Sequence, residues 1–226
     1  VIFFNDRTTM TISERKQREK GRRRQEIILA AEKVFFSKGI QQATIDDVAA
    51  EAELSKGTVY LYFKNKEEII VAIFSNGLDH LQMLMIQSAV KCKNSREKLR
   101  ALGKAYIAFA NMYPNHFELM LQKDLFKFDI DSDKPEAKAC FRKGLDLLST
   151  LKEIIVEGVQ EDEIRDDIDP SKIALIVWGQ IHGLIAIAST ITSDEQKTTY
   201  FQQFCEFKFE SIVWDTFDMI RNGIKK

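Results

Sequence analysis

Apolar side chains recur at helical spacing along nearly the whole chain, and this periodicity constrains the fold more than any other feature. Sustained alternation of apolar and polar residues, which marks a half-buried strand, is hard to find. The prolines stand where helices can begin, and Asp169 before Pro170 is a cap followed by proline. The pattern predicts an all-α protein, with helices near 24–38, 45–52, 56–63, 66–92, 96–113, 115–127, 135–160, 170–191 and 195–222.

The charge is uneven along a chain whose net charge is −1. Residues 10–66 carry 12 basic and 8 acidic side chains, whereas residues 67–226 carry 20 basic and 25 acidic ones. Binding of a polyanion is therefore expected at the N-terminal end. We divide the chain into a basic extension at 1–23, predicted to be flexible, a small helical domain at 24–66 and a larger one at 67–226. The first methionine is Met10, so residues 1–9 are interpreted as vector-derived or as an upstream extension.

Several classes of protein are disfavoured by the sequence. An odd number of distant cysteines fits neither a disulfide framework nor a zinc site, and predicts reduced thiols in a cytoplasmic protein. No run reaches the roughly 18 uninterrupted apolar residues of a membrane span. The histidines lack metal-ligand spacing. The sequence also shows no arrangement of a nucleophile with a base and no glycine-rich phosphate loop. We therefore expect that the protein is not an enzyme and that it has no metal site and no cofactor.

The small domain reads as three helices that share one core. Residue Gly39 follows the first helix where a left-handed residue is wanted. Thr44 with Asp47 makes a start like a capping box for the second helix, and Ser55 caps the third. Two short helices joined by a tight turn and supported by a longer one form a helix-turn-helix unit. The side chains expected to face inward are Ile27, Ala31, Val34, Phe35, Ile45, Val48, Ala49, Ala52, Val59 and Phe63.

The run TIDDVAAEAELSKGTVYLYFKNK at residues 44–66 resembles the DNA-binding signature of the TetR family of bacterial repressors. The match is specific over about residues 24–70, and beyond that the helical pattern and the total length agree. The family usually has glycine where this chain has Glu53. A residue other than glycine is therefore expected at positive φ in that turn, at a cost on the order of 1 kcal/mol.

The resemblance implies that the third helix reads operator DNA. Helical geometry also places Leu61 on the outward side, where an apolar side chain suits a thymine methyl group. The alternative is that Leu61 packs against a neighbouring side chain, and the tyrosines have a similar structural interpretation. The implied operator contacts are Lys56, Gly57, Thr58, Tyr60 and Tyr62 beside the cap Ser55, with Thr44 and Lys66 on phosphates.

Bulky aromatic, methionine and histidine side chains share faces of three helices in the larger domain. Their convergence suits a mostly apolar ligand pocket with few polar anchors, and ordinary core is the alternative for each residue. The resemblance implies an inducer site between these helices. The expected ligand-binding residues are Tyr106, Phe109, Tyr113, His116, Phe117, Met120, Trp178 and His182.

Small residues align on the other side of the helix 170–191. Such residues let two helix backbones approach closely. The resemblance implies a homodimer formed through the last two helices, 170–191 and 195–222, and the alternative is close packing within one subunit. The expected interface residues are Ile176, Gly179, Gly183 and Ala186, with Thr190 in register.

The resemblance therefore implies a ligand-responsive transcriptional regulator. We expect a repressor released from a palindromic operator when a small apolar or amphiphilic molecule binds the larger domain. A fatty acyl-CoA is the alternative effector. A non-specific architectural DNA binder needs basic charge spread over its surface, and the excess of acid beyond residue 66 argues against it.

Overall fold

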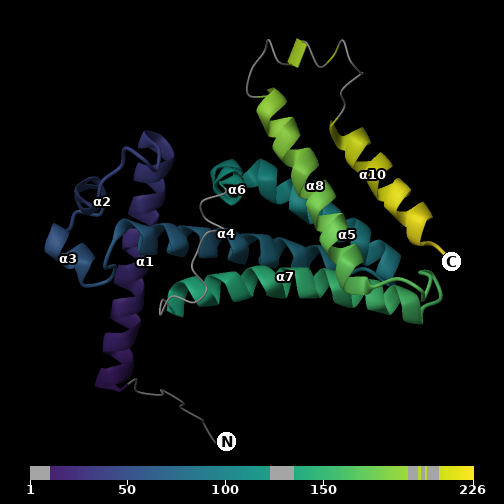
Figure 1. Ribbon diagram of the computed structural model, residues 1–226. Coiled ribbons are helices and arrows are strands. Elements are labelled where there is room, and N and C mark those ends of the chain that lie inside the picture. The colour runs from purple at the N-terminus through teal and green to yellow at the C-terminus, as the bar shows by residue number, and fades with distance from the viewer. Residues whose placement is uncertain (1–10, 123–134, 193–197, 200–201, 203–208) are drawn as a thin grey trace, which may run out of the picture. The chain divides into compact units, whose positions relative to one another are not determined.

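The computed structural model describes residues 11–122, 135–192, 198–199, 202 and 209–226 (Figure 1). The fold is all-α, as the periodicity predicted. The expected extension at 1–9, the end of the helix 115–127 and much of the first half of the helix 195–222 lie outside the described residues. The helices are α1 (Ile12–Lys38), α2 (Ile45–Glu51), α3 (Lys56–Tyr60), α4 (Lys66–Ala89), α5 (Ser95–Met112), α6 (Pro114–Leu121), α7 (Pro135–Gln160), α8 (Pro170–Thr192) and α10 (Phe209–Ile224).

Helix α1 begins about twelve residues before the expected start near residue 24. Thr11 caps it: the Glu14 amide donates to Thr11 Oγ1 at 3.2 Å, and the Thr11 amide donates to Glu14 Oε2 at 2.8 Å. Further along, Arg23 pairs with Glu26 at 2.8 Å. Residues 12–22 are exposed, so this stretch needs no apolar stripe, and a search for apolar periodicity passes over it.

The chain divides into two compact units, Val1–Ile73 and Phe74–Lys226. The sequence suggested a division after residue 66, but α4 begins in the first unit and continues into the second. In the first unit α2 packs against α1, and α3 packs against α2 (Figure 1). Their core consists of fully buried aliphatic and aromatic side chains, among them Ile27, Ala31, Phe35, Val48, Val59 and Phe63.

In the second unit α7 packs against both α5 and α8, and α10 lies beside α8 (Figure 1). Their shared core includes Leu102, Ile155 and Val177. Near the end of α10 the chain is fastened to the turn after α7, where the Arg165 amide donates to the Ile224 carbonyl at 3.0 Å. This packing places α5, α7, α8 and α10 beside the space described below.

Candidate functional site

The helix-turn-helix in the first unit is set by side-chain caps. Thr44 Oγ1 accepts from the Asp47 amide at 3.2 Å, and Asp47 Oδ2 accepts from the Thr44 amide at 2.9 Å. Hydrogen bonds from Lys38 and Thr44 lower the pKa of Asp47 to about 2. At α3, Ser55 Oγ accepts from the Thr58 amide at 3.1 Å. Both starts lie where the sequence placed them.

The turn between α2 and α3 holds Glu53 at a φ of 54°, as expected for a residue in the place of the usual glycine. The Leu54 amide donates to the Ala49 carbonyl at 2.9 Å, and the Glu53 amide donates to the Ala50 carbonyl at 3.1 Å. This pair of bonds is the Schellman arrangement, which requires a left-handed residue after the helix. The fold is retained and the strain is local.

One side of α3 faces solvent. Val59 and Phe63 are buried, whereas Tyr60 is 45% exposed and Leu61 is 79% exposed. Packing of Leu61 against a neighbour, the alternative raised by the sequence, is thus wrong in this structure. The helix ends at Tyr60 rather than near residue 63, so Leu61 and the half-buried Tyr62 lie in the following turn. An exposed leucine beside an exposed tyrosine suits contact with base edges and methyl groups.

The two lysines assigned to DNA differ in their surroundings. Lys56 Nζ lies 2.9 Å from Asp46 Oδ2, and this hydrogen bond raises the pKa of Lys56. Both side chains are more than half exposed, and such surface pairs are weak, so a DNA group can displace Asp46. Lys66 Nζ instead donates to the Gln41 carbonyl at 3.4 Å and lies 5.8 Å from the centre of the Phe35 ring. Lys66 therefore also contacts its own unit, and its phosphate contact stays a prediction.

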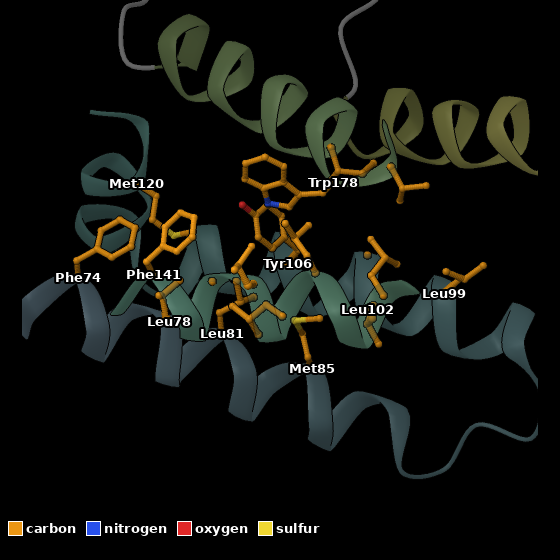
Figure 2. A pocket seen from close by; sticks show the side chains of 18 of the residues that line it. Phe74, Leu78, Leu81, Met85, Leu99, Leu102, Tyr106, Met120, Phe141 and Trp178 are labelled. Carbon is orange, nitrogen blue, oxygen red and sulfur yellow. The ribbon is translucent and has the colours of Figure 1, made fainter. Parts of the chain in front are cut away.

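The second unit contains a cavity of about 190 Å³, here called the apolar cavity (Figure 2). Helices α4 and α7 form much of its wall, α5, α6 and α8 contribute to it, and Phe217 of α10 completes it. Nearly all of the side chains that line it are hydrocarbon or thioether. Those labelled in Figure 2 are Phe74, Leu78, Leu81, Met85, Leu99, Leu102, Tyr106, Met120, Phe141 and Trp178.

Of the eight residues expected to line a ligand pocket, Tyr106, Met120 and Trp178 line this cavity. The structure places the other five outside its wall. They pack against one another instead: the Tyr113 ring lies 5.7 Å from that of Phe109 and 6.0 Å from that of His116, and the rings of Phe117 and His182 lie 5.4 Å apart. Side chains on one face of a helix can contact different neighbouring helices, depending on which edge of that face they occupy. Apolar periodicity does not distinguish these contacts. The five are Phe109, Tyr113, His116, Phe117 and His182.

A polar pair joins Tyr106 of the cavity wall to His182, which lies outside the wall. Tyr106 Oη lies 2.7 Å from His182 Nδ1, and the His182 ring stacks on Trp178 at 5.2 Å between centroids. Burial raises the pKa of Tyr106 and lowers that of His182. A protonated hydroxyl that donates to a neutral imidazole fits both directions. His182 therefore positions Tyr106 and Trp178, which form the wall.

The contribution of α4 and α7 to the cavity wall was not predicted from the sequence. In α7, Cys140, Gly144, Leu147 and Leu151 recur every three to four residues and all line the cavity. That spacing was a visible signal, but it is the same for a core-facing and a cavity-facing stripe. At Gly144 none of the described atoms lies within 4 Å of where a Cβ would stand, so this position leaves open space in the cavity wall.

The small-residue face of α8 is turned away from the core. Ile176 is 48% exposed, and at Gly179 and Gly183 none of the described atoms lies within 4 Å of where a Cβ would stand. The alternative of close packing within one subunit is therefore wrong for these glycines, as far as the described residues show. Helices α4 and α8 are long and apolar enough to cross a membrane, but the buried core helices of other proteins have the same length and hydropathy. Two further exposed side chains are Leu175 and Ile187.

Two family profiles match this chain. Residues 27–73 match the one described as bacterial regulatory proteins, tetR family, and residues 99–192 match the one described as tetracyclin repressor-like, C-terminal domain. The HTH-type transcriptional regulator TtgR of Pseudomonas putida is 34% identical over 180 residues, which cover 76% of this chain and 82% of that protein. The fatty acid metabolism regulator protein of Bacillus subtilis is 24% identical over 200 residues, 88% of this chain and 94% of that protein.

A solved structure shares the fold. The transcriptional regulator FadR from Bacillus subtilis, in complex with stearoyl-CoA, superposes with a TM-score of 0.62 at 21% identity. The match covers 88% of this chain and 98% of that one. At that identity the superposition establishes the architecture, an N-terminal helix-turn-helix followed by a larger helical domain.

Proposed function

Because this chain belongs to the TetR family of bacterial regulatory proteins, we propose that it is a homodimeric repressor controlled by an apolar or amphiphilic effector. Its relatives are named as regulators, not enzymes. The observation that carries the proposal is the apolar cavity in the second unit, in a chain whose first unit exposes Tyr60 and Leu61 on a helix-turn-helix. A repressor of this kind acts on chromosomal DNA, so we place it in the bacterial cytoplasm.

The composition of the wall favours an alkyl chain as the part of the effector that enters. Leucine, methionine and phenylalanine side chains offer no hydrogen-bond partner to a polar molecule, and each buried methylene stabilises a complex by about 0.8 kcal/mol. Relatives named for fatty acid metabolism and for a stearoyl-CoA complex support the same class. Fatty acyl-CoA is therefore our preferred effector within the wider class of amphiphiles.

Helix α4 provides a covalent route from effector to DNA. Its first eight residues, 66–73, belong to the DNA-binding unit, and Phe74, Leu78, Leu81 and Met85 further along line the apolar cavity. An effector shifts the equilibrium between two states only by its difference in affinity for them. We propose that an effector larger than the open space of the cavity displaces α4 to a position at which the two α3 helices of a dimer no longer fit successive major grooves.

The test combines operator selection with release by alkyl probes. Selection from random duplexes should yield a palindrome, and saturated acyl-CoA thioesters should release the protein from it. The affinity should rise about fourfold for each added methylene until the cavity is full, which corresponds to about 0.8 kcal/mol.

One substitution tests whether release from the operator depends on the apolar cavity. Gly144→Leu places a side chain in the open space at the wall, so it should bind the operator as the parent does and resist release. Ser149→Leu adds a leucine on the exposed side of the same helix and should behave as the parent. A palindrome that no acyl probe releases, or a Gly144→Leu protein released like the parent, would count against the proposal.

A further inference from the structure

A second cavity, of about 430 Å³, adjoins the apolar cavity and differs from it in charge. Leu99, Val177 and Phe217 line both cavities, so the two share a wall. We call the second one the basic cavity, because it is lined by five cationic and three acidic side chains. The cations are Arg96, Arg100, Arg221, Lys225 and Lys226, and the acids are Asp162, Glu163 and Asp218.

Two of these cations are already paired. Arg221 lies 3.2 Å from Asp218, and Lys226 pairs with Asp162. Arg96, Arg100 and Lys225 have no carboxylate within 4 Å among the residues that the structure describes. The Arg100 guanidinium lies 5.0 Å from the centre of the Trp214 ring, which holds it at the cavity by a cation–π contact. The basic cavity therefore offers uncompensated positive charge.

Phe217 stands between the two cavities. Its ring packs so closely on α5 that a Cβ at Gly103 would lie 2.2 Å from it, and it stacks on Trp214 at 5.5 Å. The apolar cavity beyond it is little larger than the roughly 150 Å³ that accommodates benzene. A bulky head group therefore has to remain outside the apolar cavity, on the other side of Phe217.

We propose that the basic cavity binds the phosphate-bearing head of an amphiphile whose alkyl chain lies in the apolar cavity. One arginine guanidinium group can donate two parallel hydrogen bonds to two oxygens of a phosphate. Several cations around one space favour a head group with more than one negative charge. This inference rests on the proposed function, since it takes an amphiphile as the effector. The head can belong to an acyl-CoA thioester or to a lysophospholipid, because both join an alkyl chain to phosphate.

Calorimetric titration of the full chain, without DNA, tests the inference with three probes of equal chain length. The probes are decanoyl-CoA, decanoyl lysophosphatidic acid and decanoate. At low ionic strength at least one phosphate-bearing probe should bind the parent at least tenfold more tightly than decanoate. A preference between those two probes identifies the source of the head.

Charge reversal locates the interaction. Arg96→Glu/Lys225→Glu should abolish the tenfold advantage, because a head with two or more negative charges is repelled more strongly than the single carboxylate of decanoate. Binding of the neutral probe 1-decanol should stay within about twofold, because the apolar cavity is untouched. Arg96→Gln/Lys225→Gln should reduce the tenfold advantage by an intermediate amount. Because these neutral substitutions are at exposed positions, they should not disturb folding. Lys138→Glu/Lys152→Glu makes the same double reversal at exposed positions of α7, outside the basic cavity, and should keep the advantage.

Two results overturn the inference. One is a parent protein that shows no preference for a phosphate-bearing probe, and the other is an advantage that survives in both double variants. The proposed function fails separately, when operator selection yields no palindrome or when Gly144→Leu is released like the parent. Neither of those results alters the calorimetric comparison.

Discussion

Strain at a single residue in the first unit is the price of replacing the usual glycine. Glu53 has a φ of 54°, a region in which a Cβ crowds the following carbonyl oxygen. The Schellman bonds of the turn fix that backbone conformation, so the strain persists. The sequence indicated this feature because the departure from the family pattern falls at one position with one geometric requirement.

Glu53→Gly should therefore stabilise the protein. We expect the free energy of unfolding to rise by about 0.5 kcal/mol, because relief of about 1 kcal/mol of strain is partly offset by the greater freedom of glycine in the unfolded chain. Urea unfolding followed by circular dichroism measures the change. Glu53→Ala removes the same side chain but keeps the Cβ, so it should show no such gain. Equal gains for both variants would assign the effect to the glutamate side chain instead.

His182 should make stability depend on pH. Burial lowers its pKa in the folded state below the ordinary 6.5, so the unfolded chain binds the proton more readily. The contribution of neutral His182 is fully present above pH 6.5 and is lost as the pH falls from there toward the folded pKa. Thermal unfolding across that range should show a smaller pH slope for His182→Gln than for the parent, with equal slopes above pH 8. An unchanged slope below pH 6.5 would show that other groups cause the dependence.

At the scale of the element, α8 has two apolar faces. One packs on the core through Val177, Ile181 and Ile185, and the opposite one exposes Ile176 together with Gly179 and Gly183. An apolar helix face in water is unfavourable and, next to small residues, is suited to a second helix. We therefore keep the prediction of a two-fold dimer formed by α8 and α10.

Gly183→Leu should weaken that dimer, because a leucine at the small-residue face pushes the two backbones apart. We expect the dissociation constant measured by sedimentation to rise at least tenfold. Ser171→Leu adds the same side chain to α8 on its flank and should leave the dimer intact. A Gly183→Leu protein that dimerises as tightly as the parent would place the interface elsewhere.

Helices were predictable where apolar periodicity and a capping signal coincide, and less so elsewhere. The pattern located α7 and α8 within one or two residues at each end, since a proline marks each start. It placed the start of α1 too late, because the first three turns are stabilised by Thr11 and by charge rather than by burial. It also extended α3 past Tyr60, where apolar residues continue through a turn.

At the scale of the whole molecule, the two ends of the chain differ in charge and so should differ in their response to salt. Each phosphate contact of a DNA-binding surface contributes a slope of about −0.9 to the dependence of log affinity on log salt. Operator affinity should therefore fall steeply as salt rises. Binding of 1-decanol, a neutral probe for the apolar cavity, should change by less than about twofold over the same range. A shallow operator slope, or a steep one for decanol, contradicts this division.

The cavity shows what the sequence could not give. Tyr106, Met120 and Trp178 were predicted correctly because bulky aromatic and methionine side chains that share helix faces are typical of ligand pockets. Leu81 and Leu148 line the same space, yet their spacing is that of any buried stripe. Whether a stripe meets another side chain or an opening depends on the packing of several helices at once, which no single segment records.

The absent side chain at Gly144 also has a practical use. Alanine, valine and leucine at this position would occupy successively more of the open space in the wall, and each would leave α3 and its reading face unaltered. A small set of proteins that differ at residue 144 alone would then answer to alkyl chains of graded length through one promoter. With that promoter placed upstream of a fluorescent reporter gene, the set of proteins would measure the distribution of acyl chain lengths in a living cell.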